Sequence, residues 1–309
     1  MNTYKLKLKS NHLLMLIVTV LMVLACDEDD SAEPSTPILE LSFEDPVLVN
    51  VTDYNDHLME PFLSRDGNVL FFNNLNNPSV NTNLHWATRI SDTEFQYQGE
   101  LENTNTESLE GVPSMDDQNQ LYFISTRSYD QTLSTIYQGF YSNGRLNGVS
   151  IVGNVSRNEP GWVNFDVEVS KDGNNLYFVD GRFDEDGGPY ESNFVLAQKT
   201  GNAFNRISDS DEIFMNINTD ALEYAAAITT DELELCITRV DAPLTPDSEP
   251  RLYVSRRTST SAPFPTARLI ENITGFIEGA TYTPNDDGMY FHKKDNDFHR
   301  LYFSKRVLN

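Results

Sequence analysis

The stretch "EVSKDGNNLYFVDGR", residues 168–182, decides the fold of this chain. A serine is followed by an Asp-Gly turn and then by an apolar run, Leu-Tyr-Phe-Val. Such a pattern fits a calcium-binding loop, the Asp box of a sialidase or one hairpin of a repeated β fold. An Asp box requires Ser-x-Asp-x-Gly followed by Thr and an aromatic residue, and the sequence does not show that motif. The choice therefore depends on whether the stretch is repeated.

The stretch has five copies at nearly even intervals. Each copy consists of an acidic residue, a short apolar run, Ser or Thr, a turn rich in Asp and Gly, and a second apolar run. Alternating apolar residues, interrupted by residues that tolerate a positive φ, predict a β-hairpin in each copy. The intervals are 50, 56, 57 and 55 residues, and the copies begin at Glu60, Glu110, Asp166, Glu223 and Glu278.

Two further strands are predicted after each hairpin. The third strand is indicated by "NLHWATR", "TIYQGFY", "NFVLAQK", "RLYVSRR" and "RLYFSKR". The fourth is indicated by "EFQYQGEL", "RLNGVSIV", "AFNRIS" and "PFPTARLI", with no counterpart after the fifth copy. Repeated units of four strands are typical of the blades of a β-propeller.

The missing fourth strand of the last unit is expected from the other end of the chain. Residues 39–50, "LELSFEDPVLVN", match the fourth-strand pattern. Pairing of the two chain ends would close the ring and remove exposed sheet edges. We therefore predict an all-β domain over residues 38–309: a five-bladed β-propeller of four-stranded blades closed by N- and C-terminal strands. A six-bladed ring is the alternative.

The hairpins "SRDGNVLFF" (64–72) and "SKDGNNLYF" (170–178) resemble the PD40 family, the WD40-like β-propeller repeats related to the TolB propeller. The resemblance covers nearly all of residues 38–309 and includes the Asn-Thr pairs of "NTNTESLE" and "NINTDALE". The fourth copy departs from the pattern, because it lacks the glycine and Glu223 stands two residues too early. The resemblance implies a propeller fold and a place in envelope assemblies.

The first 37 residues predict where the protein is located. Basic residues precede the apolar run "LLMLIVTVLMVLA", which ends at Cys26, and this is the pattern of a secretory signal peptide. "VLAC" resembles the lipobox of bacterial lipoproteins, which implies lipidation of Cys26 and a Gram-negative envelope. We predict a signal peptide over 1–25 and an acidic tether over 26–37, with an uncleaved membrane anchor as the alternative. The acidic run "CDEDD" favours the outer membrane over the inner membrane and leaves open a periplasmic or cell-surface face.

The charge of the chain excludes some partners. It has 22 basic and 47 acidic residues, a net charge of −25, and loss of residues 1–25 removes three lysines and no acid. Such an excess of negative charge argues against nucleic acid and against attraction to anionic membranes. It is compatible with cations, basic partners or neutral glycans, and also with a generally acidic surface that serves solubility alone.

The sequence shows few signs of catalysis. Its five histidines are scattered and form no metal-binding motif, and no Gly-x-Ser-x-Gly elbow or phosphate-binding glycine loop occurs. "FDEDGGPYES" departs from a calcium loop, because Arg182 stands where an oxygen ligand is needed. We predict no enzyme activity, no cofactor and no metal, and we expect Cys236 to be a buried, unreactive thiol.

The acids that open the repeats are the candidate site, since the first strand of each blade lines the central channel. Five acids at equivalent positions would converge at one mouth of that channel: Glu60, Glu110, Asp166, Glu223 and Glu278. They either pair with basic residues of the blades and fix the packing, or form a ligand- or cation-binding ring, or act as catalytic acids and bases. Trp162 is expected on the same face, where it would stack on a sugar.

Three functions follow from these features. The leading hypothesis is a non-enzymatic envelope lipoprotein whose propeller binds or scaffolds a protein partner. The first alternative is a glycan-binding surface lipoprotein of a saccharide-uptake system. The second is a carbohydrate-active hydrolase or lyase, because a few side chains at a channel mouth suffice to add such chemistry to a propeller.

Overall fold

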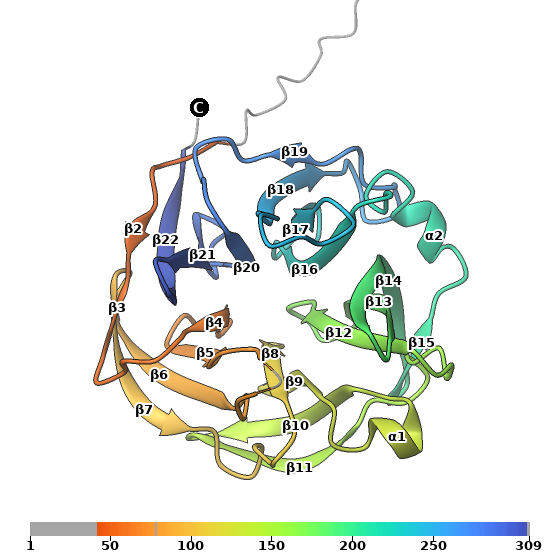
Figure 1. Ribbon diagram of the computed structural model, residues 1–309, viewed down its shortest axis with the longest axis horizontal. Coiled ribbons are helices and arrows are strands. Elements are labelled where there is room, and N and C mark those ends of the chain that lie inside the picture. Colours follow the sequence, from red (N-terminus) through yellow and green to blue (C-terminus); the bar gives the residue numbers. More distant parts are fainter. Residues whose placement is uncertain (1–41, 78, 308–309) are drawn as a thin grey trace, which may run out of the picture. The chain divides into compact units, whose positions relative to one another are not determined.

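Figure 1 shows five groups of strands arranged around a central axis. The computed structural model describes residues 42–77 and 79–307. The predicted signal peptide, the lipidated Cys26 and the tether therefore lie outside the described residues. The described chain is nearly all β, with 22 strands and two four-residue helices, α1 (Tyr129–Thr132) and α2 (Ser210–Ile213). None of its helices has the length and apolar character that crossing a membrane requires.

The five groups, called units here, each contain a run of antiparallel strands. The first unit contains β4 (Met59–Leu63), β5 (Val69–Asn73), β6 (Leu84–Ser91) and β7 (Glu94–Glu100). The second contains β8 (Glu110–Met115), β9 (Gln120–Ser125), β10 (Ile136–Ser142) and β11 (Arg145–Ile151). The third contains β12 (Trp162–Val169), β13 (Asn175–Asp184), β14 (Gly187–Thr200) and β15 (Ala203–Arg206). The fourth contains β16 (Leu222–Ile228), β17 (Glu234–Val240), β18 (Arg251–Arg256) and β19 (Arg268–Leu269). The fifth contains β20 (Ile277–Tyr282), β21 (Gly288–Asp295) and β22 (Phe298–Val307).

Three short strands connect the two ends of the described chain. β1 (Ser42–Phe43) and β2 (Val47–Leu48) pair antiparallel with β22, where a fourth strand of the fifth unit is expected. β3 (Asn50–Thr52) then pairs parallel with β7 of the first unit. A single parallel bridge between β14 and β16 joins the third and fourth units into one eight-stranded sheet. The remaining units belong to separate sheets.

The quoted stretch is a hairpin between β12 and β13, and its polar residues hold the turn. The Ser170 hydroxyl donates to Asp172 at 2.7 Å and accepts the backbone N–H of Asn175 at 2.9 Å. Asp172 also accepts the backbone N–H of Asn174 at 3.0 Å. Gly173 has φ +73°, which a side chain would strain, and a Cβ there would meet Asp116. The Asp and Gly of the repeat therefore serve the turn.

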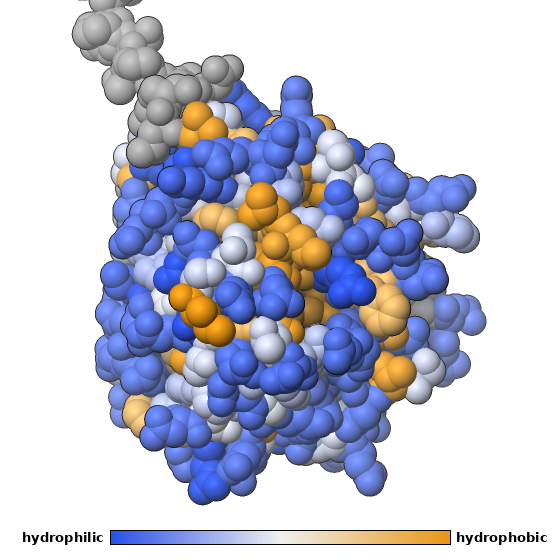
Figure 2. Space-filling view, turned by 90° about the vertical axis from the view of Figure 1, so that its left-hand side faces the viewer, coloured by the Kyte–Doolittle hydropathy of each residue, from blue (hydrophilic) through white to orange (hydrophobic). Residues whose placement is uncertain are grey.

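The core lies between neighbouring units, where apolar faces of adjacent sheets meet. Leu70 and Phe72 of the first unit pack in one cluster with Tyr290 and Leu301 of the fifth. Tyr177, Phe194 and Phe214 pack similarly with strands of the fourth unit. Burial of each such side chain contributes about 2–3 kcal/mol. The outer surface is different: Figure 2, which views the side of β2 and β3, is mainly hydrophilic, with some apolar residues near its middle.

Candidate functional site

A β-bulge interrupts the first strand of every unit and turns one residue toward the axis. In each unit this bulge residue lies three positions before the last residue of the first strand. Four of the five bulge residues have φ between +47° and +61°. All five line one narrow passage of about 20 Å³. The bulge residues are Glu60, Val112, Asp166, Ala225 and Gly279.

The expectation that five acids converge at one mouth is corrected by this register. Glu60 and Asp166 occupy the bulge position, and Glu278 stands one residue before it. Glu110 and Glu223 stand two residues before it. In the second unit the turn begins at Asp116, which accepts the backbone N–H groups of Gln118 and Gln120 at 2.9 Å. Ser114, which stands where the other repeats have their turn serine or threonine, lies two residues before the turn, so alignment of the repeats on this serine placed Glu110 in the wrong register.

Glu110 and Glu223 are fully buried within their own units and bind arginine. Glu110 lies 3.1 Å from Arg127 and accepts the hydroxyl and the backbone N–H of Thr106 at 2.8 and 2.7 Å. Glu223 accepts Nε of Arg239 at 2.8 Å. The threonines of the Asn-Thr pairs thus cap these acids. Arg182 follows the predicted second strand of its repeat as Arg127 and Arg239 do, but it is exposed, and the third unit pairs Asp180 with Arg206 instead.

The structure brings Glu60, Asp166 and Glu278 together, and we call them the axial carboxylates. They line a cavity of about 660 Å³, the axial cavity, to which all five units contribute. Its walls are largely apolar and include Phe165, Phe183 and Phe276. Volumes of this size and lining are usual for small-molecule sites. The axial cavity is therefore the main candidate site.

Glu278 is held in one orientation by two donors. The Tyr224 hydroxyl donates to Oε1, and Nε2 of His292 lies 3.2 Å from Oε2. The backbone N–H of Glu60 donates to Nδ1 of His292 at 3.1 Å, so the ring proton is on Nε2 and faces Glu278. Burial acts to raise the pKa of Glu278, but the hydrogen bonds from His292 and Tyr224 lower it below its usual value. Glu278 is therefore ionised at neutral pH.

The pKa values of the other two axial carboxylates are shifted in the opposite direction, upward. Burial, with smaller contributions from the charges of Glu278 and Glu168, raises the pKa of Asp166 to about 8. Burial and the charges of Asp166 and Glu278 raise the pKa of Glu60 well above its usual value. Gly279 makes room for Glu60, because a Cβ on Gly279 would overlap Oε2 of that carboxylate. Three adjacent acids thus include protonated and ionised forms at the same pH.

The end of the passage away from the axial cavity is occupied by a salt bridge. Arg65, in the turn after β4, reaches Glu168 of the third unit at 3.0 Å and donates to the Met115 carbonyl at 3.1 Å. The side chains of Arg65 and Glu168 are only 9% and 6% exposed. The passage itself is too narrow for anything larger than water. A ligand larger than water therefore cannot reach the axial cavity through this passage.

Trp162 does not line the axial cavity. Its ring packs against the guanidinium of Arg157, 3.6 Å from the ring centroid. The aromatic residues that line the cavity are Phe165, Phe183, Tyr224 and Phe276. No sequence pattern singled out these residues or His292, although Phe165 directly precedes Asp166.

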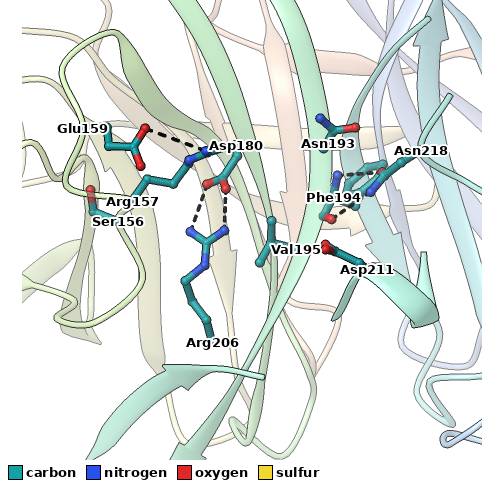
Figure 3. A pocket seen from close by; sticks show the side chains of 10 residues that line it. All are labelled: Ser156, Arg157, Glu159, Asp180, Asn193, Phe194, Val195, Arg206, Asp211 and Asn218. Carbon is teal, nitrogen blue, oxygen red and sulfur yellow. Dashed lines mark hydrogen bonds and ion pairs between the residues drawn. The ribbon is translucent and has the colours of Figure 1, made fainter. Parts of the chain in front are cut away.

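A second cavity, of about 680 Å³, lies beside β13 and β14 (Figure 3). Four of its five charged residues bind each other: Asp180 pairs with Arg206, and Arg157 lies 3.8 Å from Glu159. Asn218 is bound to the backbone of Phe194 at 2.8 and 3.1 Å. This lining offers fewer free groups than the axial cavity. Neither cavity holds a cluster of three or more His, Cys, Asp or Glu placed to bind a metal, within residues 42–77 and 79–307.

No protein-family model matches the sequence, and no curated protein matches it either. Solved structures match in fold. An α-L-arabinofuranosidase from Podospora anserina is 10% identical with a TM-score of 0.52, and the match covers 87% of this chain and 97% of that one. A family 117 glycoside hydrolase from Zobellia galactanivorans is 10% identical with a TM-score of 0.53, over 87% and 91%. TolB from Acinetobacter baumannii is 12% identical with a TM-score of 0.44, over 82% and 55%.

These likenesses concern the fold alone, because the identities are so low. The chain is a nearly all-β protein with a β-propeller fold. The predicted membership of the PD40 family stays a prediction.

Proposed function

We propose that the protein binds a saccharide in the axial cavity. The observation that carries this proposal is the meeting of three carboxylates, one buried and two partly buried, with aromatic and aliphatic walls in one cavity. Carboxylate oxygens accept hydrogen bonds from sugar hydroxyls, and phenyl rings pack against the C–H faces of sugar rings. The fold likeness to glycoside hydrolases is in line with the proposal. This is the glycan-binding alternative of the sequence analysis.

A second candidate function is hydrolysis of a glycosidic bond. It is favoured by the opposite pKa shifts of Glu278, which is ionised at neutral pH, and Asp166, which is protonated. Glycosidases require such a pair, one carboxylic acid to protonate the leaving group and one carboxylate to act as base or nucleophile. Release of reducing ends from an oligosaccharide by the wild type and not by Asp166→Asn would establish this activity.

The finer features of the fold and the location belong to the same proposal. We propose a five-bladed ring in which β1 and β2 complete the fifth blade and β3 links it to the first. Pairing of β2 with β22 and of β3 with β7 supports this closure. The lipobox-like "VLAC" supports an outer-membrane lipoprotein anchored through Cys26. Scaffolding of an envelope protein partner stays a prediction.

Isothermal titration calorimetry against a panel of oligosaccharides tests the binding function. The panel includes pentose, hexose, amino-sugar and uronic-acid backbones. We expect at least one member to bind, and Glu278→Gln to weaken its binding about tenfold or more, as expected when a buried polar group loses its charge. Glu159→Gln, which alters an acid of the second cavity, is the matched control and leaves affinity unchanged. Absence of any binding, or equal loss in both variants, would refute the proposal.

A further inference from the structure

Among the described residues, six buried acids lie outside the axial cavity, and one of them, Asp116, accepts backbone N–H groups of its own turn. Five of them form salt bridges with arginine and are at most 6% exposed: Glu110, Glu168, Asp180, Glu223 and Glu234. The axial carboxylates differ, because no lysine or arginine is among the described residues that line their cavity. Each of these five acids therefore contacts a guanidinium group, and within the described chain the axial carboxylates do not.

Two of the axial carboxylates also receive no hydrogen bond from any side chain of the described residues. Asp166 is 5% exposed, and no side chain among the described residues donates a hydrogen bond to it. Its partner in the protein is the backbone N–H of Ala225. The carboxylate of Glu60 likewise receives no side-chain hydrogen bond within the described chain, and Gly279 leaves space beside it. Both groups line the cavity, so their free acceptors face a ligand.

The third carboxylate contributes the permanent negative charge. Hydrogen bonds from the side chains of Tyr224 and His292 keep Glu278 ionised. The site therefore combines one fixed negative charge with two acids whose oxygens have no cation nearby. An ammonium group has three N–H donors and a positive charge, so it can donate to carboxylate oxygens that line the cavity and offset their charge. An acidic sugar would be repelled by the same groups.

We propose that the saccharide bound in the axial cavity is an amino sugar, whose protonated amine lies among Glu60, Asp166 and Glu278. This inference rests on the proposed saccharide-binding function and specifies its ligand. The apolar walls contact the sugar ring, and the three carboxylates replace the water that surrounds the ammonium in solution. Arginine provides the cation at the five buried acids named above, and the ligand provides it at the axial carboxylates.

Binding of the ammonium is expected to expel a proton from the site. At about pH 6.5 Asp166, whose pKa is about 8, is protonated, and a cation beside it favours its ionised form. The pKa of Glu60 is raised in the same direction by burial and by the charges of Asp166 and Glu278. The groups that face the site from the surrounding strands are the three axial carboxylates together with Glu168, Tyr224, His292 and His299. Calorimetry in two buffers of different ionisation enthalpy measures the proton release, and we expect about one proton per ligand.

The experiment compares oligosaccharides that differ only at one substituent. Each backbone is presented as the free amine, the N-acetylated form and the hydroxyl form, and affinity is measured by calorimetry at about pH 6.5. We expect the amine to bind at least about tenfold more tightly than either neutral form, with proton release seen only for the amine. Asp166→Asn reduces the preference, whereas Glu159→Gln preserves it. The proton measurement uses the wild type and does not depend on the folding of a variant.

The outcomes separate this inference from the function on which it rests. If a neutral form binds as tightly as the amine, the amino-sugar assignment is overturned while saccharide binding stands. If no form of any backbone binds, both proposals fall. If the amine is preferred but Asp166→Asn and Glu60→Gln retain the full preference, the ammonium lies elsewhere and the assignment of the site is overturned.

Discussion

Replacement of Gly279 by alanine tests the geometry of the axial carboxylates. Gly279 has φ +61°, and a Cβ there would overlap Oε2 of Glu60 and lie 3.1 Å from Nδ1 of His292. Gly201 is a matched control, because its φ is +63° and a Cβ there has no atom within 4 Å. Both substitutions incur the same left-handed strain, about 1 kcal/mol. Only Gly279→Ala must also displace a buried carboxylate, which adds about 1–3 kcal/mol.

The free energy of unfolding of each variant is measured by urea denaturation at neutral pH. We expect Gly201→Ala to lose about 1 kcal/mol and Gly279→Ala to lose about 2–4 kcal/mol. Saccharide affinity falls only in Gly279→Ala, since that variant moves Glu60 out of the site. If the two variants lose equal stability, the Glu60 carboxylate does not lie against Gly279. The arrangement of the three axial carboxylates would then be incorrect.

Three further predictions concern the buried titratable groups. Glu110→Gln is expected to destabilise the protein by about 3 kcal/mol, because Arg127 loses its buried partner, and to leave saccharide affinity unchanged in calorimetry. The folded-state pKa of Asp166, about 8, lies above its unfolded value, so this group makes stability fall as pH rises from about 4 to 8. Asp166→Asn therefore gains stability relative to the wild type as pH rises across that window, and urea titrations with parallel pH profiles would contradict this. Cys236 is fully buried and burial raises its pKa, so it reacts with a thiol reagent only after unfolding; fast labelling of the native protein would refute its burial.

The propeller-type repeat was predictable because turn chemistry is local. Ser, Asp and Gly at fixed spacing, as in Ser170, Asp172 and Gly173, hold a hairpin through contacts within five residues. The alternation of apolar residues then indicates which face of each strand is buried. These signals required no knowledge of distant contacts. They predicted the strands of each unit and the pairing of residues 42–48 with β22.

The membership of the site was harder to predict, because a bulge changes the register by one residue. In a regular strand a shift of one residue moves a side chain to the opposite face. Glu110 and Glu278 each open a repeat in the sequence, yet Glu110 binds Arg127 inside its unit and Glu278 lines the axial cavity. The donor His292 lies on β21, the strand after the one that carries Glu278, and no local sequence pattern linked the two residues. Their role depends on the packing of strands within and between units.

The site arises where the repeats differ. The bulge position is occupied by two acids, at Glu60 and Asp166, and by Val112, Ala225 and Gly279 in the other units. Five acids at this narrow passage would repel one another strongly, and five small residues would leave it without polar groups. Two acids with three uncharged neighbours leave these carboxylates next to Glu278, in a cavity whose described lining contains no arginine. The repeated hairpins thus build the five units, and the departures from the repeat place the axial carboxylates in the cavity between them.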